Sequence, residues 1–438
     1  MKIQLIKKVN EILPAWIKKP FSPIIRNKLI NNKIFLDQYN ELLDLDMCIE
    51  DELKLIQFER LKDTLVYAYN NTKYYRKIFD SVNFNPCQMK NLEDLENIPI
   101  LDKKKLSDNY NDIISEDVDD AYSVSTGGTS GAPIHLLMDR KAIFKEWAFI
   151  YHYWSKYGYN FRESRLATFR GVDLNNKISE ENPLYREIRL NPFIMNDNNI
   201  EKYIHKIKNY KADFLYGYPS AIYNFCRLVE KHRIDISKMF TAVFLISENL
   251  YDFQEEIIKK VTGCKIAMFY GHTERAVFAE RTDKGYVFNR LYGFTELSNE
   301  GCPIVTSFIN RKMPLIRYMV DDKVSLVDNN TYSIIGHRDM EVLHGNNGEQ
   351  VSVASINFHD DTFDAVTAYQ FVQEEIGKCT LRIQSDNSLS EVDINKIHKR
   401  VSQKLGKGFV CDVRKVDKIE LTKRGKYKML IQDIKLDL

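Results

Sequence analysis

Several features that would decide a protein's class at once are missing from this chain of 438 residues. No run of about 18 apolar residues is present, so the sequence predicts no membrane-spanning helix. The N-terminus lacks the continuous apolar segment and the small-residue cleavage site of a signal peptide. The seven cysteines are scattered, without a Cys-x-x-Cys pair, which argues against a disulfide framework or a structural zinc site. These absences predict a cytoplasmic protein.

A strong excess of charge of one sign is also absent. The formal net charge is +2, whereas a dedicated nucleic-acid binder would carry a large basic excess, so we expect no nucleic-acid partner. The charge is uneven, because the first 33 residues hold eight Lys or Arg and one Glu. Residues 1–50 are therefore interpreted as a basic amphipathic lead-in. It either docks on the main domain or makes peripheral contact with the inner face of an anionic membrane, and docking is the simpler interpretation.

The order of expected elements predicts two domains. From residue 165 to residue 269, short apolar runs alternate with amphipathic stretches, which indicates α/β layers with partly parallel strands. Residues 285–335 change to short β runs, as in an antiparallel sheet or a distorted barrel. We therefore expect a large domain at 1–335 and a small, mobile α+β domain at 336–438. The expected helices are 50–82, 141–157, 200–209, 219–232, 253–262 and 393–405, and the expected parallel strands are 165–170, 212–217, 242–246 and 265–269.

A loop of small residues between an expected strand at 121–124 and the helix at 141–157 is the first candidate site. Residues 125–131 hold three Gly and four hydroxyl side chains in a chain otherwise poor in Gly. Backbone N–H groups of such a loop can approach an anion closely, and the hydroxyls add donors. The Gly-Lys-Ser/Thr ending of the common phosphate loop is absent. Alone, the loop is either a phosphate cradle or an ordinary flexible surface loop.

Four further motifs follow the loop. Tyr270-Gly271-His272-Thr273-Glu274 directly follows an expected strand, so Glu274 can face a cleft at the carboxyl end of that strand. Another strand ends on the paired carboxylates Asp321 and Asp322. Gly336-His337-Arg338-Asp339 lies at the expected domain boundary, and Lys423-Arg424-Gly425-Lys426 lies near the end of the chain. Each motif alone has an ordinary explanation as a turn, a loop or surface charge, and it is their joint occurrence in this order that is informative.

With these motifs the chain resembles the adenylate-forming superfamily of acyl-CoA synthetases. Within it, the chain is similar to the phenylacetate–CoA ligase-like branch, which includes capsular-polysaccharide biosynthesis proteins. The resemblance covers nearly the whole chain. Further stretches that carry it are residues 58–79, 98–103, 216–220 and 246–250, and residues 270–278 and 356–361 resemble the polysaccharide-associated members in particular.

The resemblance implies a nucleotide site that binds ATP and Mg²⁺. Glu274 would hold Mg²⁺, with Thr129 in support, because this hard cation prefers oxygen ligands. Asp322 would accept hydrogen bonds from the ribose, and Arg338 would also reach the nucleotide. The β- and γ-phosphates would be held by Ser125, Thr126, Gly127, Gly128, Thr129, Ser130 and Gly131. The rest of the nucleotide would be bordered by Ser247, Glu248, Tyr270, Gly271, His272 and Thr273.

The resemblance also implies a role for the small C-terminal domain. Lys426 would enter the cleft and stabilise the charge that develops as a carboxylate attacks the α-phosphate. Asp339 would be the hinge about which the domain turns. Two departures from the family pattern stand out. Ile134 follows the loop's Pro where Lys is frequent, and Asp321 replaces the usual Gly, which is expected to add an uncompensated negative charge near the ribose.

The implied function is that of an AMP-forming ligase. It would activate a small carboxylic acid as an acyl-adenylate and pass the acyl group to coenzyme A or to a sugar amine or hydroxyl, in capsule or O-antigen biosynthesis. An acyl-CoA synthetase of the phenylacetate–CoA ligase kind is one alternative. A non-catalytic scaffold or carbohydrate-binding subunit is another, and the presence of Glu274 and Lys426 favours catalysis over it. A nucleic-acid ligase or a kinase is not expected, because neither a lysine nucleophile motif nor a Gly-Lys-Ser/Thr loop is present.

Overall fold

The structure is a computed structural model. It describes residues 15–30, 32–125, 135–170, 174, 176–247, 250, 252–335, 342–353, 356, 361–363, 365, 366, 368–385, 389–417, 419, 420, 429–432 and 434. None of the helices in these ranges is long and apolar enough to cross a lipid bilayer.

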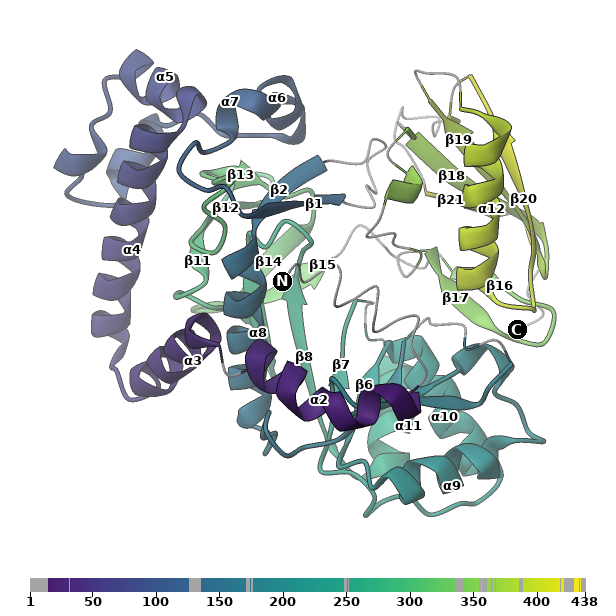
Figure 1. Cartoon of the computed structure of the whole chain (residues 1–438). Coiled ribbons are helices and arrows are strands. Elements are labelled where there is room, and N and C mark those ends of the chain that lie inside the picture. The colour runs from purple at the N-terminus through teal and green to yellow at the C-terminus, as the bar shows by residue number, and fades with distance from the viewer. Residues whose placement is uncertain are drawn as a thin grey trace.

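A ten-stranded sheet lies at the centre of the larger part of the chain (Figure 1), in the order β14-β15-β10-β9-β8-β7-β6-β3-β5-β4. Five neighbouring strands, from β5 to β8 in this order, are parallel. The strands on either side of them are antiparallel. The bounds are β3 (Leu166–Phe169), β4 (Ser179–Asn182), β5 (Glu187–Leu190), β6 (Phe214–Gly217), β7 (Ala242–Leu245), β8 (Lys265–Gly271), β9 (Phe278–Thr282), β10 (Gly285–Phe288), β14 (Lys323–Asp328) and β15 (Thr331–Ile335).

Helices cover both faces of the parallel strands. Val243 and Leu245 pack into one core with helices α9 (Ile200–Tyr210), α10 (Pro219–Lys231) and α11 (Asp252–Thr262). The alternate residues of the same strand, Ala242 and Phe244, pack into a second core with α8 (Arg140–Ser155). Trp154 of α8 stacks on Phe244 with ring centroids 4.3 Å apart. Because successive strand residues point to opposite faces, a strand covered on both sides is apolar throughout, and every residue of β7 is both apolar and buried.

The chain before the sheet is helical. Its helices are α2 (Ala15–Ile30), α3 (Lys33–Leu45), α4 (Glu50–Asn71), α5 (Lys73–Ser81), α6 (Lys103–Asp108) and α7 (Tyr110–Ile113), with short 3₁₀ turns at Pro86–Gln88 and Glu93–Asn97. Three acidic residues in the first turn of α4 complement its helix dipole. Leu61 and Leu65 on one side of α4 are fully buried and pack in a core with the strands β11 (Gly293–Leu297), β12 (Pro303–Ser307) and β13 (Tyr318–Met319), which form a separate three-stranded sheet.

The small-residue loop belongs to a β-hairpin. β1 (Ala121–Ser125) pairs antiparallel with β2 (His135–Asp139), and Ser125 lies opposite His135. The sequence predicted that this loop connects a strand directly to the helix at 141–157, which corresponds to α8. The structure corrects this, because β2 lies between them and α8 begins directly after it. Residues 126–134, which connect the two strands, lie outside the described residues.

The C-terminal part has its own sheets and core. Here β16 (Val342–His344) pairs with β17 (Gln350–Ser352), and a four-stranded sheet has the order β20-β19-β18-β21. The helix α12 (Glu391–Leu405) packs on this sheet through Ile397 and Val401. The remaining bounds in this part are β18 (Ala368–Glu375), β19 (Lys378–Gln384), β20 (Val410–Lys415), β21 (Leu430–Gln432) and the 3₁₀ turn Asp361–Phe363. A further 3₁₀ turn, Pro192–Ile194, belongs to the larger part of the chain.

The expected fold class, a large mixed α/β part followed by a C-terminal domain, is confirmed. The β-rich segment at 285–335 is divided between two sheets. Its strands β10, β14 and β15 belong to the ten-stranded sheet, and β11, β12 and β13 form a separate three-stranded sheet. The division at residues 335 and 336 stays a prediction, since 336–341 lie outside the described residues.

Candidate active site

The carboxyl ends of four parallel strands lie at one edge of the ten-stranded sheet. Phe169 of β3 lies beside Gly217 of β6, and Gly217 lies beside Leu245 of β7. β8 runs parallel to β7 and continues to Gly271. The segments after these strands therefore meet at one edge, which we call the carboxyl edge. Open α/β sheets bind their ligands at such an edge.

Two side chains converge on the carboxylate of Asp322. Tyr270 Oη donates to Asp322 Oδ2 over 2.8 Å, and His272 Nε2 donates to the same oxygen over 3.0 Å. The rings of Tyr270 and His272 meet edge to face with centroids 4.6 Å apart. The side chains of His272 and Asp322 are 14% and 23% exposed. The cluster is therefore rigidly held and still within reach of a ligand.

The second ring nitrogen of His272 is a further polar group in this cluster. Because Nε2 donates to Asp322, Nδ1 of the neutral imidazole is an acceptor. This Nδ1 is buried and has no hydrogen-bond partner among the described residues. A buried polar atom without a partner lowers stability. The atom therefore fits a ligand that brings a donor, such as a hydroxyl or amino group of a nucleoside.

Glu274 lies half-buried in the turn that follows β8. The turn is closed by a 3.1 Å hydrogen bond from the N–H of Arg275 to the carbonyl of His272. The backbone of Arg275 has a φ of 49°, a left-handed conformation that is uncommon for residues with a Cβ. Burial, and then the negative charge of Glu274, raise the pKa of the Tyr318 hydroxyl above its ordinary value. Tyr318 therefore stays neutral next to the carboxylate.

The side chain of Arg275 joins this turn to β1 and α8. Its Nε donates to Glu146 Oε2 over 2.6 Å, and its Nη1 donates to Tyr122 Oη over 2.8 Å. The side chains of Arg275 and Glu146 are 16% and 21% exposed, so water screens this pair only weakly. Tyr122 lies in β1, three residues before Ser125. The contact therefore fixes the strand that leads into the small-residue loop relative to Glu274.

Asp321 has a partner of opposite charge. Lys103 Nζ, at the first residue of α6, forms an ion pair and a hydrogen bond with Asp321 Oδ2. The two side chains are 25% and 28% exposed. The expectation of an uncompensated negative charge at Asp321 is therefore wrong. Residues 98–103 are one of the stretches that carry the family resemblance, and their last residue, Lys103, contacts the site.

Two further residues stand at the carboxyl edge. Ser247 follows β7, is exposed and has a φ of 66°, a strained backbone of the kind that occurs at functional sites. Arg170 directly follows β3, is exposed, and lies 5.6 Å from the centroid of the Tyr216 ring. Among the described residues, no carboxylate forms an ion pair with Arg170. Its positive charge is therefore available to an anion at this edge.

The structure brings together part of the predicted site. Ser247 follows β7, Tyr270 and Gly271 end β8, and His272, Thr273 and Glu274 come directly after β8. Asp322 joins this group through its hydrogen bonds with Tyr270 and His272. Ser125 ends β1, which Arg275 connects to this group. The roles of these residues stay predictions. The predicted site residues outside the described residues are Thr126, Gly127, Gly128, Thr129, Ser130, Gly131, Glu248, Arg338, Asp339 and Lys426.

A divalent cation is compatible with this donor set. Within the described residues, no group of three or more His, Cys, Asp or Glu side chains is arranged to hold a metal ion. Mg²⁺ does not need such a group, because it keeps several waters and commonly takes one or two carboxylates together with substrate phosphates. Glu274 alone is therefore a sufficient protein carboxylate for Mg²⁺.

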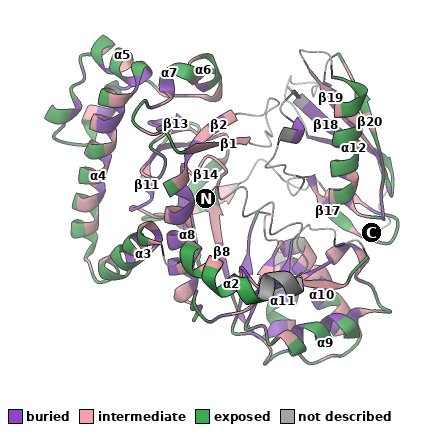
Figure 2. Cartoon of the chain, in the orientation of Figure 1, coloured by how far each residue is buried: buried purple, intermediate pink, exposed green. Residues whose placement is uncertain are grey.

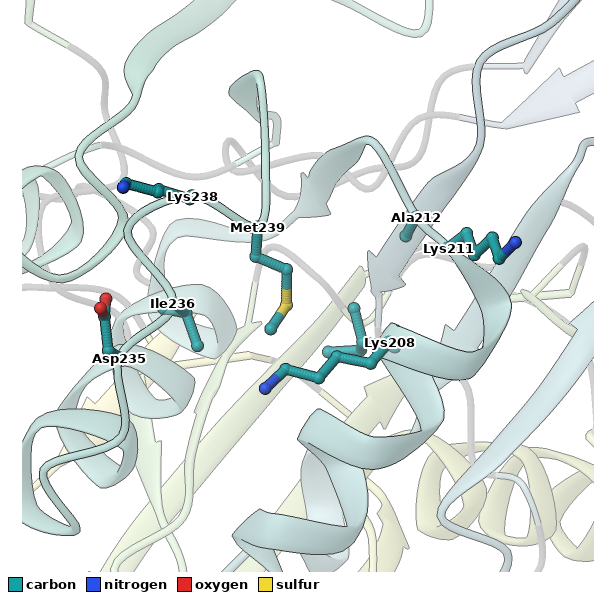
Figure 3. A pocket seen from close by; sticks show the side chains of 8 residues that line it. Lys208, Lys211, Ala212, Asp235, Ile236, Lys238 and Met239 are labelled. Carbon is teal, nitrogen blue, oxygen red and sulfur yellow. The ribbon is translucent and has the colours of Figure 1, made fainter.

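A pocket lies at the opposite, amino-terminal edge of the parallel strands. It is lined by residues that precede β6 and β7, among them Lys208, Lys211, Asp235, Lys238 and Met239. Figure 3 shows that the three lysine ammonium groups point in different directions. They therefore do not converge on one anion, and this pocket is separate from the carboxyl edge.

Sequence reasoning missed Arg170, Lys103 and Arg275. A usable signal existed for Arg170, because it is the last residue of the expected parallel strand at 165–170. Lys103 and Arg275 act through partners far away in the sequence, 218 and 129 residues from Asp321 and Glu146. Nothing in a single sequence pairs such residues.

Comparisons with known proteins show what the whole chain is similar to. Residues 343–433 match the family described as the CapK C-terminal domain. The chain is 23% identical to Protein CapK of Staphylococcus aureus over 449 residues, which covers 94% of this chain and 98% of that protein. It is 40% identical over 70 residues to the phenylacetate-coenzyme A ligase of Aromatoleum evansii, covering 16% of each. The match to this ligase is thus confined to a short part of its length.

Among solved structures, the chain is similar to a 2-hydroxyisobutyryl-CoA ligase in complex with 2-HIB-AMP and CoA. The TM-score is 0.54 at 17% identity, covering 88% of this chain and 91% of the other. The fold is therefore that of the adenylate-forming CoA ligases. Within that superfamily the chain lies near CapK and the phenylacetate–CoA ligases, as the sequence motifs predicted.

Proposed function

We propose that this protein activates a carboxylic acid with ATP, forming an acyl-adenylate and pyrophosphate, and then transfers the acyl group to an acceptor. The observation that carries the proposal is the arrangement at the carboxyl edge. The hydrogen-bonded cluster of Tyr270, His272 and Asp322 lies next to Glu274, and Arg275 ties that turn to the strand before the small-residue loop. The similarity to adenylate-forming ligases supports the same chemistry.

The chemistry needs each of these groups for a different reason. Carboxylates are poor electrophiles, and a bond to the α-phosphate gives the acyl carbon a good leaving group. In the proposal, Asp322 holds the ribose, and Ser247 borders the adenine. The loop that begins at Ser125 binds the phosphates through backbone N–H groups and hydroxyls. Mg²⁺ at Glu274 would neutralise charge on the phosphates. Lys426 would stabilise the charge that develops on the attacked phosphate.

The acid and the acceptor are expected near β6 and β3, beside the proposed nucleotide position at β7 and β8. Arg170 offers an exposed guanidinium there, which suits a carboxylate or phosphate group. The acceptor is coenzyme A or a sugar amine or hydroxyl. The similarity to CapK along nearly the whole chain supports a role in surface-polysaccharide biosynthesis, and the similarity to CoA ligases supports coenzyme A.

The test is ATP–pyrophosphate exchange with a panel of carboxylic acids, each with and without coenzyme A. We expect exchange that depends on one class of acid, followed by AMP release when the correct acceptor is added. A folded protein that binds oligosaccharide but gives no exchange with any acid would instead be a scaffold or carbohydrate-binding subunit. Thioester formation with coenzyme A, compared with an amide or ester on a sugar, distinguishes the two acceptors.

A further inference from the structure

The helix α2 is docked through one face and leaves apolar side chains exposed on the other, and Figure 2 shows exposed residues along this helix. On the docked face, Ser22 is buried and Ile25 packs against the core that α8 shares with the sheet. Arg26 on the same side donates to the carbonyl of Phe161. On the outward face, Phe21 and Ile24 are 60% and 61% exposed. Because they are three residues apart on a helix, they lie side by side.

Basic residues accompany this outward face. Lys28 is exposed and lies four residues after Ile24 and seven after Phe21, which places it on the same stripe of the helix. Lys33 follows shortly after, with its side chain 87% exposed, although it forms a 3.6 Å ion pair with Asp37 in α3. The first 33 residues as a whole hold eight Lys or Arg and one Glu. The apolar face of α2 is therefore part of a strongly basic segment.

A second group of exposed apolar residues provides a contrast within the same protein. At the junction of α3 and α4, Met47, Ile49 and Leu55 are 88%, 66% and 63% exposed. This corner is acidic, because it also carries Asp44, Asp46, Glu50, Asp51 and Glu52. Similar apolar exposure thus occurs with opposite charge at two places in the chain. An anionic surface would attract the first and repel the second.

We propose that the outward face of α2 docks on a lipid bilayer with anionic headgroups. Phe21 and Ile24 enter the boundary between headgroups and acyl chains, while Lys28 and its basic neighbours stay among the lipid phosphates. Two exposed apolar side chains with several lysines give reversible, peripheral binding. This surface is independent of the carboxyl edge and of the proposed reaction.

The experiment uses the full-length protein and sedimentation with two kinds of vesicle, phosphatidylcholine alone and phosphatidylcholine with one quarter phosphatidylglycerol. We expect binding to the anionic vesicles that weakens as NaCl is raised, and little binding to the neutral ones. The double variant F21S/I24S should lower the partition coefficient by about tenfold or more. The matched double variant M47S/I49S, at the acidic corner, should bind as the unmodified protein does.

Two further measurements keep the outcomes distinct. K28E retains the apolar face and should weaken binding to anionic vesicles only. All these positions are exposed, so the midpoint of thermal unfolding should be unchanged in each variant. If the midpoint of F21S/I24S is shifted, its loss of binding could reflect a damaged fold, and K28E becomes the deciding variant. Equal binding to both vesicles, no binding to either, or equal loss in both double variants would each overturn the proposal. Loss of a dimer in F21S/I24S without any lipid binding would instead make this face a contact between two copies.

Discussion

Glu274 occupies a short turn whose geometry depends on its neighbours rather than on itself. The substitution E274Q keeps the size of the side chain and removes its charge. We expect acid-dependent exchange to fall by about 100-fold, comparable to the loss of one preorganised electrostatic group. The Mg²⁺ concentration for half-maximal activity should rise at the same time. Full exchange activity in a folded E274Q protein would contradict the proposed role, and E300Q, at an exposed turn, is the matched control.

The ion pair between Lys103 and Asp321 leads to a second prediction at the level of single residues. Removing the cation with K103M leaves the Asp321 carboxylate unpaired beside Asp322. We expect the KM for ATP in exchange to rise by about tenfold, because a nearby like charge disturbs the Asp322 cluster. kcat should change much less. K105M, which removes an exposed lysine 3.9 Å from Asp102, is the control.

A compensating substitution makes this prediction sharper. The family resemblance implies Gly at position 321, so D321G is a suitable change that removes the charge that Lys103 neutralises. The double variant K103M/D321G should recover a KM for ATP close to that of the unmodified protein. If the KM for ATP of the double variant is no lower than that of K103M, Lys103 does not act by neutralising Asp321. The comparison is informative because the free-energy effects of substituting two residues that share one interaction are not additive.

At the scale of elements, the contact between β3 and β6 depends on a residue without a side chain. A Cβ on Gly217 would lie 2.0 Å from the carbonyl oxygen of Phe169. This oxygen belongs to the backbone, so it cannot move away by a side-chain rotation. We expect G217A to lower the free energy of unfolding by roughly 2–4 kcal/mol, because the two strands must separate at the carboxyl edge. Urea unfolding measures this. G348A, where an added Cβ would meet nothing within 4 Å, carries only the strain of an alanine at a φ of 78°, about 1–2 kcal/mol, and should cost less than G217A.

The alternating elements were predictable because their signals are local. The predicted helix at 200–209 is α9 (Ile200–Tyr210), and the predicted strand at 242–246 is β7 (Ala242–Leu245). Amphipathic spacing and short buried runs suffice for such elements. β2 was missed, because its five residues directly precede a helix and carry no turn signal of their own. Its partner β1 was recognised only as the end of a strand.

The candidate site was predictable only in part, for a related reason. Tyr270, His272 and Asp322 were found because they lie in motifs at strand ends. Their mutual hydrogen bonds depend on β8 and on the segment after β13 meeting in space, which sequence spacing does not specify. The ion pair with Lys103 compensates the negative charge of Asp321, which the sequence had predicted to be uncompensated. The sequence motifs thus indicated the region, while the partners that orient its side chains became visible only in the fold.

At the scale of the whole molecule, the C-terminal domain is proposed to change position between the two half-reactions. K426A should lower adenylate formation by about 100-fold or more, because Lys426 would act only while the carboxylate attacks ATP. Transfer from a chemically prepared acyl-adenylate should be affected much less. Single-turnover assays of each half-reaction measure this. Equal losses in both would contradict the two-position proposal, and no loss in either would make Lys426 an ordinary surface lysine.

Phe193 belongs to a 3₁₀ turn of the large part of the chain, yet it packs in the hydrophobic core of the C-terminal part. It is 9% exposed, and a Cβ added to Gly406 at the end of α12 would lie 2.9 Å from it. α10 and β17 also touch across the same boundary. In the proposed rotation of the C-terminal domain, this ring would leave that core. Since burying a Phe contributes about 1.5–3 kcal/mol, the ring acts as a latch that favours the present arrangement by roughly ten- to hundredfold. In the proposed catalytic cycle, the rate of turnover would then depend on how quickly one aromatic ring leaves this core.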